Sequence, residues 1–558
     1  MENIKNATCV DDVMDQGQAS RTGADTDAMA AIEDGPPRDT PTPEILTRLW
    51  ASDAAEGLAR RAPRFSARTG LSPYQRWTLM IAVGFLVLGA AGWMNWEVSL
   101  LTGLVGLLFG CLISLRLLAC LLPPVWARHR PLPACALPRA SLIIALYRES
   151  AVLPVLVSAL EAIDYPADRL EIRLALEADD SETIAVARAL DLDQKYRIVL
   201  IPEGGPRTKP RALNYALRFC SGEIVTIHDA EDRPHPRQLR TAAESFAAAG
   251  PELACLQAPL NWFNRAECWL TRQFALEYAA HFHTLLPLYA RLRWPLPLGG
   301  TSNHFRTAAL RRAGGWDAWN VTEDADLGFR LHALGYRCDI IAPLTLEEAP
   351  TRVWPWVCQR TRWLKGYAQT LAVHSRPSGL PEQRQSHFAL TLTLGAALIS
   401  ALAHAPLAAA CLLALIGVLA DKGADSATWL HGGFLALGYG TSAATAALGM
   451  RRAGLGVRLS DLLLMPLYWP LQSWAAVRAL YQLATRPYFW DKTEHGLSTF
   501  TDPACISRSP PHSSSSEPAP ESSCWHAGGP GSPSVPNGDH ASSPGPSSPS
   551  SRPPSVSS

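Results

Sequence analysis

Two groups of long apolar runs enclose a block of mixed composition, and this arrangement constrains the fold more than any other feature. Residues 77–93 and 98–122 are almost wholly apolar, and apolar runs return between positions 388 and 483. A helix of about 20 apolar residues is long enough to span a membrane. The sequence therefore predicts two transmembrane helices in residues 77–122 and about four in residues 388–483.

Arginines indicate where the central block lies. Arg68 and Arg76 precede the first run, and Arg128 and Arg130 follow the second, whereas the link between the two runs has none. Positively charged residues accumulate on the cytoplasmic side of a membrane. We therefore expect a multi-pass protein of the cell inner (plasma) membrane with its central block in the cytosol.

The C-terminal runs divide less clearly into spans. Residues 388–420 are too long for one comfortable span, and Ala405-Pro406 suggests a hairpin of two short ones. Residues 429–450 and 462–483 are two more. Four crossings would leave Arg451 and its neighbouring arginines outside, against the positive-inside tendency. This conflict leaves open that one of the four is re-entrant or interfacial.

The two ends of the chain carry little apolar sequence. Residues 1–76 are expected to be a flexible cytosolic region with a short helix near 43–62, which either docks on the protein or lies on the membrane surface. Residues 501–558 are rich in Ser, Pro and Gly and are expected to be disordered. The net charge is zero, so nothing predicts a nucleic-acid partner.

The central block, residues 138–375, alternates short apolar runs with amphipathic helices. This alternation is typical of an α/β domain with a mainly parallel sheet. Residues 140–146, 170–176, 197–201 and 223–227 are the expected first four strands. Ligands bind at the carboxyl ends of the strands in such a sheet. We therefore expect the site where the strands end.

The acidic turn after the fourth strand is the first candidate site. Asp229 and Glu231 can present two carboxylates to one Mg²⁺ or Mn²⁺, with Asp232 as an alternative second ligand. The bland alternative is a solvated acidic turn that caps a helix beginning near Pro234. Residue type and spacing do not separate these two interpretations.

Two further clusters follow in the same block. Asp324 lies just after Thr322, a good N-cap, and a carboxylate held there could accept a proton from a sugar hydroxyl. Gln359, Arg362 and Trp363 share one face of a helix, where they could bind a sugar ring and phosphate. Alternatively, this helix lies at the membrane interface. Arg360 and Lys365 would then point toward lipid headgroups.

In this order, after strands that end in Glu149 and Asp179-Asp180, the three clusters resemble glycosyltransferase family 2 with the GT-A fold. More narrowly they resemble membrane-integrated processive synthases of the cellulose, chitin and hyaluronan type. The resemblance implies Asp324 as the catalytic base and Asp229 and Glu231 as metal ligands. It implies an acceptor glycan bound by Glu323, Gln359, Arg362 and Trp363. It implies nucleotide-sugar contacts by Tyr147, Glu149, Glu177, Asp179, Asp180, Lys209, Trp490, Lys492 and Thr493, the last three in a cytosolic gating-type loop at 484–500.

The leading hypothesis is a membrane glycosyltransferase that moves a hexose-type sugar from a nucleotide-diphosphate sugar to a growing polysaccharide, with inversion and coupled export. Its expected partners are the donor, a glycan acceptor and the lipid bilayer, and an export partner is left open. One alternative is a non-processive enzyme that adds a single sugar to a lipid carrier. Another is a transporter or scaffold with an inert α/β insert.

Overall fold

The computed structural model describes residues 43–90, 95–377, 383–419, 426–491 and 498. All of them belong to one compact unit, Met1–Pro510. The expected flexible arm before residue 43, the tail that is expected to be disordered and the predicted donor contacts of Lys492 and Thr493 lie outside the described residues.

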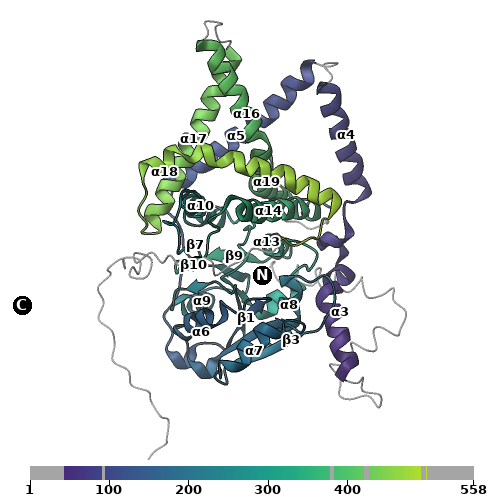
Figure 1. Cartoon of the computed structure of the whole chain (residues 1–558), viewed down its shortest axis with the longest axis vertical. Helices are drawn as coiled ribbons and strands as arrows, with labels where there is room; N and C mark the ends of the chain where they lie inside the picture. Colours follow the sequence, from purple (N-terminus) through teal and green to yellow (C-terminus); the bar gives the residue numbers. More distant parts are fainter. Residues whose placement is uncertain (1–42, 91–94, 378–382, 420–425, 492–497, 499–558) are drawn as a thin grey trace, which may run out of the picture. The chain divides into compact units, whose positions relative to one another are not determined.

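A seven-stranded sheet forms the centre of the α/β domain (Figure 1). Its strand order is β3-β2-β1-β4-β8-β6-β9, and β1 pairs in parallel with both β2 and β4. Only β8 runs antiparallel to its neighbours. The sheet is therefore mainly parallel and GT-A-like, as predicted. The strands are Ala140–Leu146 (β1), Leu170–Glu177 (β2), Tyr196–Ile201 (β3), Ile224–His228 (β4), Leu253–Gln257 (β6), Asn303–Arg306 (β8) and Arg337–Ile340 (β9).

Alternate residues of the central strands supply two hydrophobic cores, one on each face of the sheet. Ile143 of β1 packs in the core that includes α8 (Lys209–Leu217), whereas Leu142 packs in the core that includes α6 (Leu153–Glu161). Because both faces are covered, the strands read as continuous apolar runs. The remaining helices of the domain are η4 (Ala134–Ala136), η5 (Ala167–Arg169), α7 (Ser181–Ala189), α9 (Gln238–Ala248), α10 (Trp269–Ala280), η6 (His281–Leu285), α11 (Leu286–Arg291), α12 (Thr307–Arg312), α13 (Glu323–Ala333) and α14 (Val353–His374).

A smaller three-stranded sheet, in the order β5-β10-β7, lies beside the acidic turn. Its strands are Arg233–Pro234 (β5), Leu260–Trp262 (β7) and Thr345–Glu347 (β10). The chain thus continues after Glu231 as a strand, and α9 begins only at Gln238. The alternative of an acidic turn that caps a helix near Pro234 is therefore wrong.

The N-terminal helix α3 (Pro43–Arg61) packs on α8 of the α/β domain. The edge of the Trp50 ring meets Phe219 with 5.9 Å between ring centroids. Two short turns follow, η2 (Pro63–Phe65) and η3 (Ala67–Thr69), and the Ala67 N–H donates to buried Asp317 at 2.6 Å. Of the two alternatives for this helix, the contacts favour docking on the protein.

Two helices of the described chain are long and apolar enough to cross a membrane, over Gly103–Leu121 and Ser386–Val418. Only 11% and 6% of these segments is buried inside the protein, so neither is an ordinary core helix. The wider set of six predicted spans is not confirmed. The helices in these regions are α4 (Pro73–Ala90), α5 (Asn95–Leu121), α15 (Gln383–Leu390), η7 (Thr391–Gly395), α16 (Ala396–Leu419), α17 (Ser426–Arg452), α18 (Leu459–Leu463) and α19 (Met465–Thr485).

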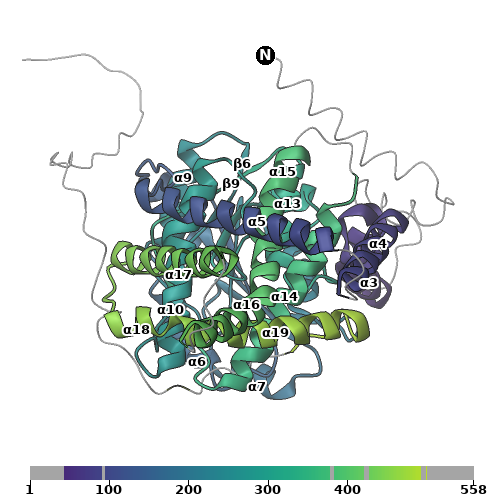
Figure 2. The ribbon, with the colours of Figure 1, turned by 90° about the horizontal axis from the view of Figure 1, so that it is seen from above.

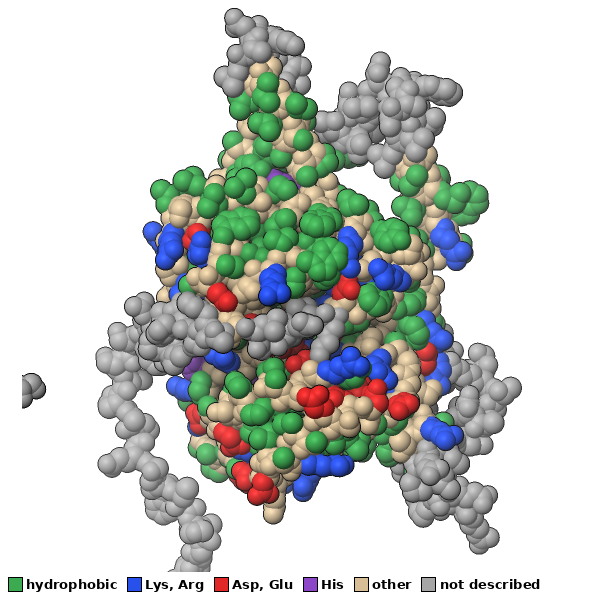
Figure 3. Space-filling model, viewed as in Figure 1, with side chains coloured by type: hydrophobic (Ala, Val, Ile, Leu, Met, Phe, Trp, Pro, Cys, Tyr) green, Lys and Arg blue, Asp and Glu red, His purple; other side chains and the backbone are tan. Residues whose placement is uncertain are grey.

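The predicted hairpin at Ala405-Pro406 is wrong, because Pro406 lies inside the single helix α16. Helix α19 also differs from a simple span, since it packs along α14 of the α/β domain and crosses the direction of α16 and α17 (Figure 1). Hydrophobic side chains gather over α16, α17 and α19, whereas acidic side chains gather on the α/β part (Figure 3).

Candidate functional site

One cavity of about 2000 Å³ brings the three sequence clusters together. Its wall contains Asp229 and Glu231 from the turn after β4, Asp324 from α13, and Arg362 and Trp363 from α14. The cavity is larger than the roughly 300–1,000 Å³ of a typical small-molecule site. It can therefore hold more than one substrate group.

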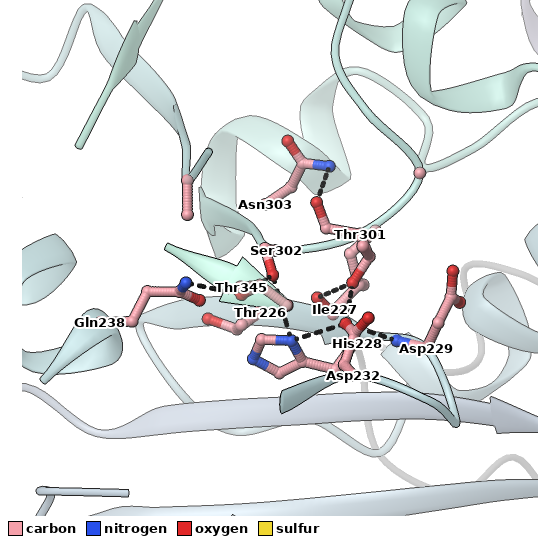
Figure 4. Close-up of polar contacts among 12 residues, drawn as sticks. Thr226, Ile227, His228, Asp229, Asp232, Gln238, Thr301, Ser302, Asn303 and Thr345 are labelled. Atoms are coloured by element: carbon pink, nitrogen blue, oxygen red, sulfur yellow. Dashed lines mark hydrogen bonds and ion pairs between the residues drawn. The ribbon is translucent and has the colours of Figure 1, made fainter. Parts of the chain in front are cut away.

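Asp232 holds the acidic turn in shape through its contacts with Asp229, Thr301 and His228 (Figure 4). Its buried carboxylate accepts the Asp229 backbone N–H at 2.9 Å and the Thr301 hydroxyl, and lies 3.1 Å from Nδ1 of His228. Asp232 does not line the cavity, whereas Asp229 and Glu231 do. This arrangement favours Glu231 over Asp232 as the residue that would bind a metal ion together with Asp229.

The turn concentrates negative charge. Burial raises the pKa of Glu231 well above its usual value, and the charges of Asp229 and Asp232 raise it further. Glu347 of β10 lines the same cavity, and its pKa is raised for the same reasons, burial first. Glu347 could not be singled out from the sequence, because nothing around it distinguishes it from a solvent-exposed acid. A cation bound here would offset this charge.

Lys209 supplies one positive charge at the first residue of α8. Its ammonium group donates to the Asp229 carboxylate, and to the Gly300 carbonyl oxygen at 2.7 Å. Burial alone would lower the pKa of the Lys209 ammonium group. The negative charges of Asp229 and Glu323 outweigh this effect, so the pKa of Lys209 is raised. The lysine therefore stays protonated beside the acidic turn, where it could meet a phosphate.

The acidic turn fits a divalent cation. Within the described residues no three His, Cys, Asp or Glu side chains form a ready metal cage. Mg²⁺ is usually held by one or two carboxylates together with substrate phosphates and water. Asp229 and Glu231 would supply those two carboxylates, and their crowded charge would be relieved by the ion.

Asp324 lies at the start of α13. Burial raises its pKa, although the Ala325 N–H, which donates to Oδ1 at 2.8 Å, acts in the opposite direction. Thr322 occupies the N-cap position, but its side chain makes no capping hydrogen bond; its hydroxyl lies 3.4 Å from Oδ1 of Asn320. The predicted helix start is confirmed, whereas the predicted threonine cap is wrong.

Helix α14 presents unused hydrogen-bonding atoms to the cavity. Oε1 of Gln359 and Nε of Arg362 are buried without a partner among the described residues, and both side chains line the cavity. The Arg362 guanidinium stacks over the Trp490 ring at 4.5 Å from its centroid. Trp490 is held there by the preceding backbone, because Lys365 donates to the Phe489 carbonyl oxygen at 2.6 Å.

The alternative that Arg360 and Lys365 face lipid headgroups is wrong, since both are buried. Arg360 forms two bonds to the Glu277 carboxylate, at 2.7 and 2.9 Å, and Tyr468 of α19 donates to the same carboxylate at 2.7 Å. This network joins α14 to α10 and α19. The sequence did not show it because Glu277 lies 83 positions before Arg360.

The predicted nucleoside contacts divide into two groups. Tyr147, Glu149 and Glu177 line the cavity, whereas Asp179 and Asp180 do not. Asp180 instead accepts the Thr183 N–H at 3.3 Å as the N-cap of α7, and the Arg148 N–H at 2.5 Å.

Two arginines that the sequence did not single out engage this end of the cavity. Arg207 lines it, pairs with Asp179 at 2.9 Å and donates to the Tyr147 hydroxyl at 3.0 Å. Arg211 is buried and pairs with Glu177 at 3.2 Å. Asp179 and Glu177 are therefore engaged with arginines, and of the predicted donor contacts only Tyr147, Glu149 and Glu177 line the cavity at this end.

An open, mainly parallel sheet with acidic and basic side chains at the carboxyl ends of its strands defines an α/β domain of the GT-A type. Residues 138–366 match the family model described as glycosyltransferase like family 2. The α/β domain is therefore a glycosyltransferase family 2 domain, and this match disfavours the inert insert of the transporter alternative.

The curated relatives match this domain and part of its surroundings. Beta-monoglucosyldiacylglycerol synthase of Synechocystis sp. is 30% identical over 301 residues, which cover 52% of this chain and 58% of that protein. Glucomannan 4-beta-mannosyltransferase 2 of Arabidopsis thaliana is 28% identical over 238 residues, covering 40% of this chain and 43% of that protein. The chain thus spans about half the length of these relatives.

Among solved structures, the mannosyltransferase PcManGT from Pyrobaculum calidifontis, in complex with GDP-Man and Mn²⁺, is similar to the chain with a TM-score of 0.41 and 20% identity. The similarity covers 68% of this chain and 99% of that chain.

Proposed function

We propose that the chain is a membrane-bound, inverting glycosyltransferase that moves a hexose-type sugar from a nucleotide-diphosphate sugar to an acceptor hydroxyl at the cytosolic face. The observation that carries this proposal is the single cavity wall that joins Lys209, the Asp229–Glu231 pair, Asp324 and the Gln359–Trp363 face of α14. Cations, a candidate base and a sugar-binding face then act on one reacting centre.

Each group has a distinct role in a single displacement. Tyr147 and Glu149 would hold the nucleoside, and Lys209 would bind the diphosphate. A divalent ion held by Asp229 and Glu231 would stabilise the charge that develops on the departing diphosphate. Asp324 would take the proton of the acceptor hydroxyl, and its raised pKa makes it a stronger base than an exposed aspartate.

The membrane attachment is also part of the proposal. Helix α5 and the continuous stretch from α15 through η7 to α16, which contain the two apolar segments, would cross the inner membrane together with α4 and α17. Helix α19 would lie at the interface, because its outward face carries Leu467, Trp474 and Val477 while its other face packs on α14. The catalytic domain would then lie against the cytosolic surface.

Two acceptor classes fit this site. A growing polysaccharide, exported through the protein's own helices, is supported by the Gln359 and Trp363 face and by the glucomannan-forming activity that one relative's name states for that relative. A single transfer to a lipid is supported by the apolar helices that continue the cavity and by the diacylglycerol glucoside named for another relative. Product length separates them, since the first gives a polymer and the second one sugar per acceptor.

Replacement of the base tests the proposed function. Asp324→Asn should lower the transfer rate by about 10²–10⁴-fold, the usual contribution of a general base, because asparagine cannot take the proton. Donor binding should be nearly unchanged, since Asp324 is not among the donor contacts. Transfer of labelled sugar from UDP-glucose and GDP-mannose in membranes, with donor affinity measured in parallel, checks both statements. Normal turnover in this variant would refute the assignment of Asp324.

A further inference from the structure

The cavity continues beyond the catalytic groups into a section lined by the apolar helices. This apolar section is formed by α5 from Gly103 to Ile113, together with Leu407 of α16 and Phe434 of α17. At 1.5 Å per residue, Gly103 to Ile113 extends about 15 Å along α5. That length is about half of the roughly 30 Å hydrocarbon core of a bilayer, the depth of one leaflet.

Three glycines keep the α5 face of this section open. Gly103, Gly106 and Gly110 recur at helical spacing and therefore share one side of α5. All three line the cavity, and a Cβ built on any of them would have no atom within 4 Å. Larger side chains at these three positions would narrow the apolar section of the cavity without clashing with neighbouring residues.

The lining changes from polar to apolar along the cavity. Oε1 of Gln359, a side chain only 7% exposed, has no partner at the catalytic end. Arg116 of α5 lines the cavity beyond Ile113, on the side of Tyr289 of α11. Near the section from Ile113 to Gly103, His404 of α16 and Tyr439 of α17 also line the cavity, but these two side chains already bond to each other at 3.2 Å. Few groups are therefore left to bond to sugar hydroxyls, and hydroxyls buried there without partners would be costly. The gradient fits an amphipathic molecule better than a glycan chain.

The helices also leave a lateral route into the section. Helix α5 packs along α17, as the view from above shows (Figure 2), and α16 packs along α19. Helices α5 and α16 both line the cavity; α5 meets η7, just before α16 begins, but makes little contact along α16 itself. A molecule in the bilayer could therefore reach the cavity between them without passing through water.

We propose that the acceptor is an amphipathic lipid whose hydrocarbon chain occupies the apolar section while its hydroxyl head reaches Asp324. This inference rests on the proposed function, which it deepens by naming the acceptor class. The lipid enters between α5 and α16, and Gln359 binds the head.

Two native cysteines allow a test that does not depend on catalysis. Cys111 and Cys411 line the cavity, whereas Cys120, also on α5, does not, and all three are free thiols. The full chain is placed in a fluorinated surfactant, whose chains mix poorly with hydrocarbon. Alkylation of each cysteine by N-ethylmaleimide is then followed by mass spectrometry. Hexadecyl β-D-glucoside, methyl β-D-glucoside and cellopentaose serve as probes, because the first two differ only in the chain.

Hexadecyl glucoside should slow alkylation of Cys111 and Cys411 by about tenfold at ten times its half-protecting concentration, and Cys120 should be unaffected. Methyl glucoside should protect neither cysteine. Gly106→Leu should weaken protection by filling the section. Gly417→Leu is the matched control, since Gly417 lies on apolar α16 away from the cavity and its Cβ would also meet no atom.

Protection by cellopentaose but not by hexadecyl glucoside would overturn the inference in favour of a polysaccharide path, and the absence of protection by any probe would overturn it outright. Sugar transfer from UDP-glucose and GDP-mannose is measured on the same samples. Protection by hexadecyl glucoside without sugar transfer would refute the proposed function but support the lipid site. Sugar transfer without protection would support the proposed function and refute the lipid site.

Discussion

The three acids of the turn after β4 differ in which groups already bind their carboxylates. The sequence placed Asp229 and Glu231 at the end of a strand and left Asp232 as an alternative ligand. The structure separates them, because Asp232 does not line the cavity and its Oδ2 atom is bound by Thr301, His228 and the Asp229 N–H. Which oxygens are already bonded depends on residues from other strands, and no local pattern contains that information.

Glu231→Ala should therefore affect metal binding, whereas Asp232→Ala should affect the stability of the fold. Loss of Glu231 should raise the Mg²⁺ or Mn²⁺ concentration needed for half-maximal transfer, with little change in stability. Loss of Asp232 should lower stability by about 1–3 kcal/mol, because buried donors lose their acceptor. Metal titrations of activity and thermal unfolding of both variants provide the measurement. Equal metal dependence in the two variants would contradict the assignment of Glu231.

Glu323 gives a prediction about pH. Burial, together with the neighbouring Asp324 charge, raises the pKa of Glu323 from 4.5 to about 8. It is therefore protonated at neutral pH, and raising the pH through 8 adds a second negative charge beside the base. Transfer should fall on this alkaline side, and Glu323→Gln, which stays neutral, should remove the decline.

The same shift has a consequence for stability. The folded protein binds this proton more tightly than the unfolded chain, so the free energy of unfolding should decrease as pH rises from about 4.5 to 8. Glu323→Gln should weaken that dependence. Identical pH profiles of activity and stability in the variant and the unchanged protein would contradict the raised pKa.

At the scale of elements, the strands were the most predictable part of the fold. The first observed strand, Ala140–Leu146, has the predicted bounds, because a strand buried on both faces is a continuous apolar run. The break at Ala405-Pro406 was mispredicted, since α16 continues through Pro406. Proline is tolerated in membrane helices, where neighbouring groups can satisfy the freed backbone carbonyl.

The contact between α13 and α14 was not visible in the sequence, and it depends on Gly366. A Cβ on Gly366 would lie 2.7 Å from Cβ of Thr322 and closer still to its other side-chain atoms. The glycine thus lets α14 approach the turn that carries Glu323 and Asp324. The close approach brings the base and the Gln359 face to one cavity wall.

Gly366→Ala should push Thr322 and the following Asp324 out of place. A displacement of about 1 Å at a reacting group can cost about 10²-fold in rate. Sugar transfer should fall by that order while donor binding changes little. Gly395→Ala is the matched control, since its Cβ would lie 3.5 Å from Leu371 of α14, an ordinary contact. Equal activity of the two variants would show that the tight approach at Gly366 is unimportant.

At the scale of the whole molecule, the proposed membrane arrangement would remove a conflict that the sequence raises. Four crossings after the catalytic block would leave Arg451 and Arg458 outside, against the positive-inside tendency. If α16 is one crossing and α17 the next, as proposed, two crossings would return the chain to the cytosolic side before those arginines. Arg452 then lies near the α/β domain, where it donates to the His283 carbonyl oxygen at 3.2 Å.

This topology predicts which positions of α17 and α18 can be labelled from outside the cell. Trp429 is 68% exposed near the start of α17, and Ser460 is exposed in α18 beyond its end. In intact cells a membrane-impermeant maleimide should label Trp429→Cys above the background of the native cysteines. It should label Ser460→Cys only after the membrane is permeabilised. The opposite pattern would restore the four-crossing arrangement. It would also separate α18 from the catalytic domain, contrary to the bond between Arg272 of α10 and Asp461 at 3.0 Å.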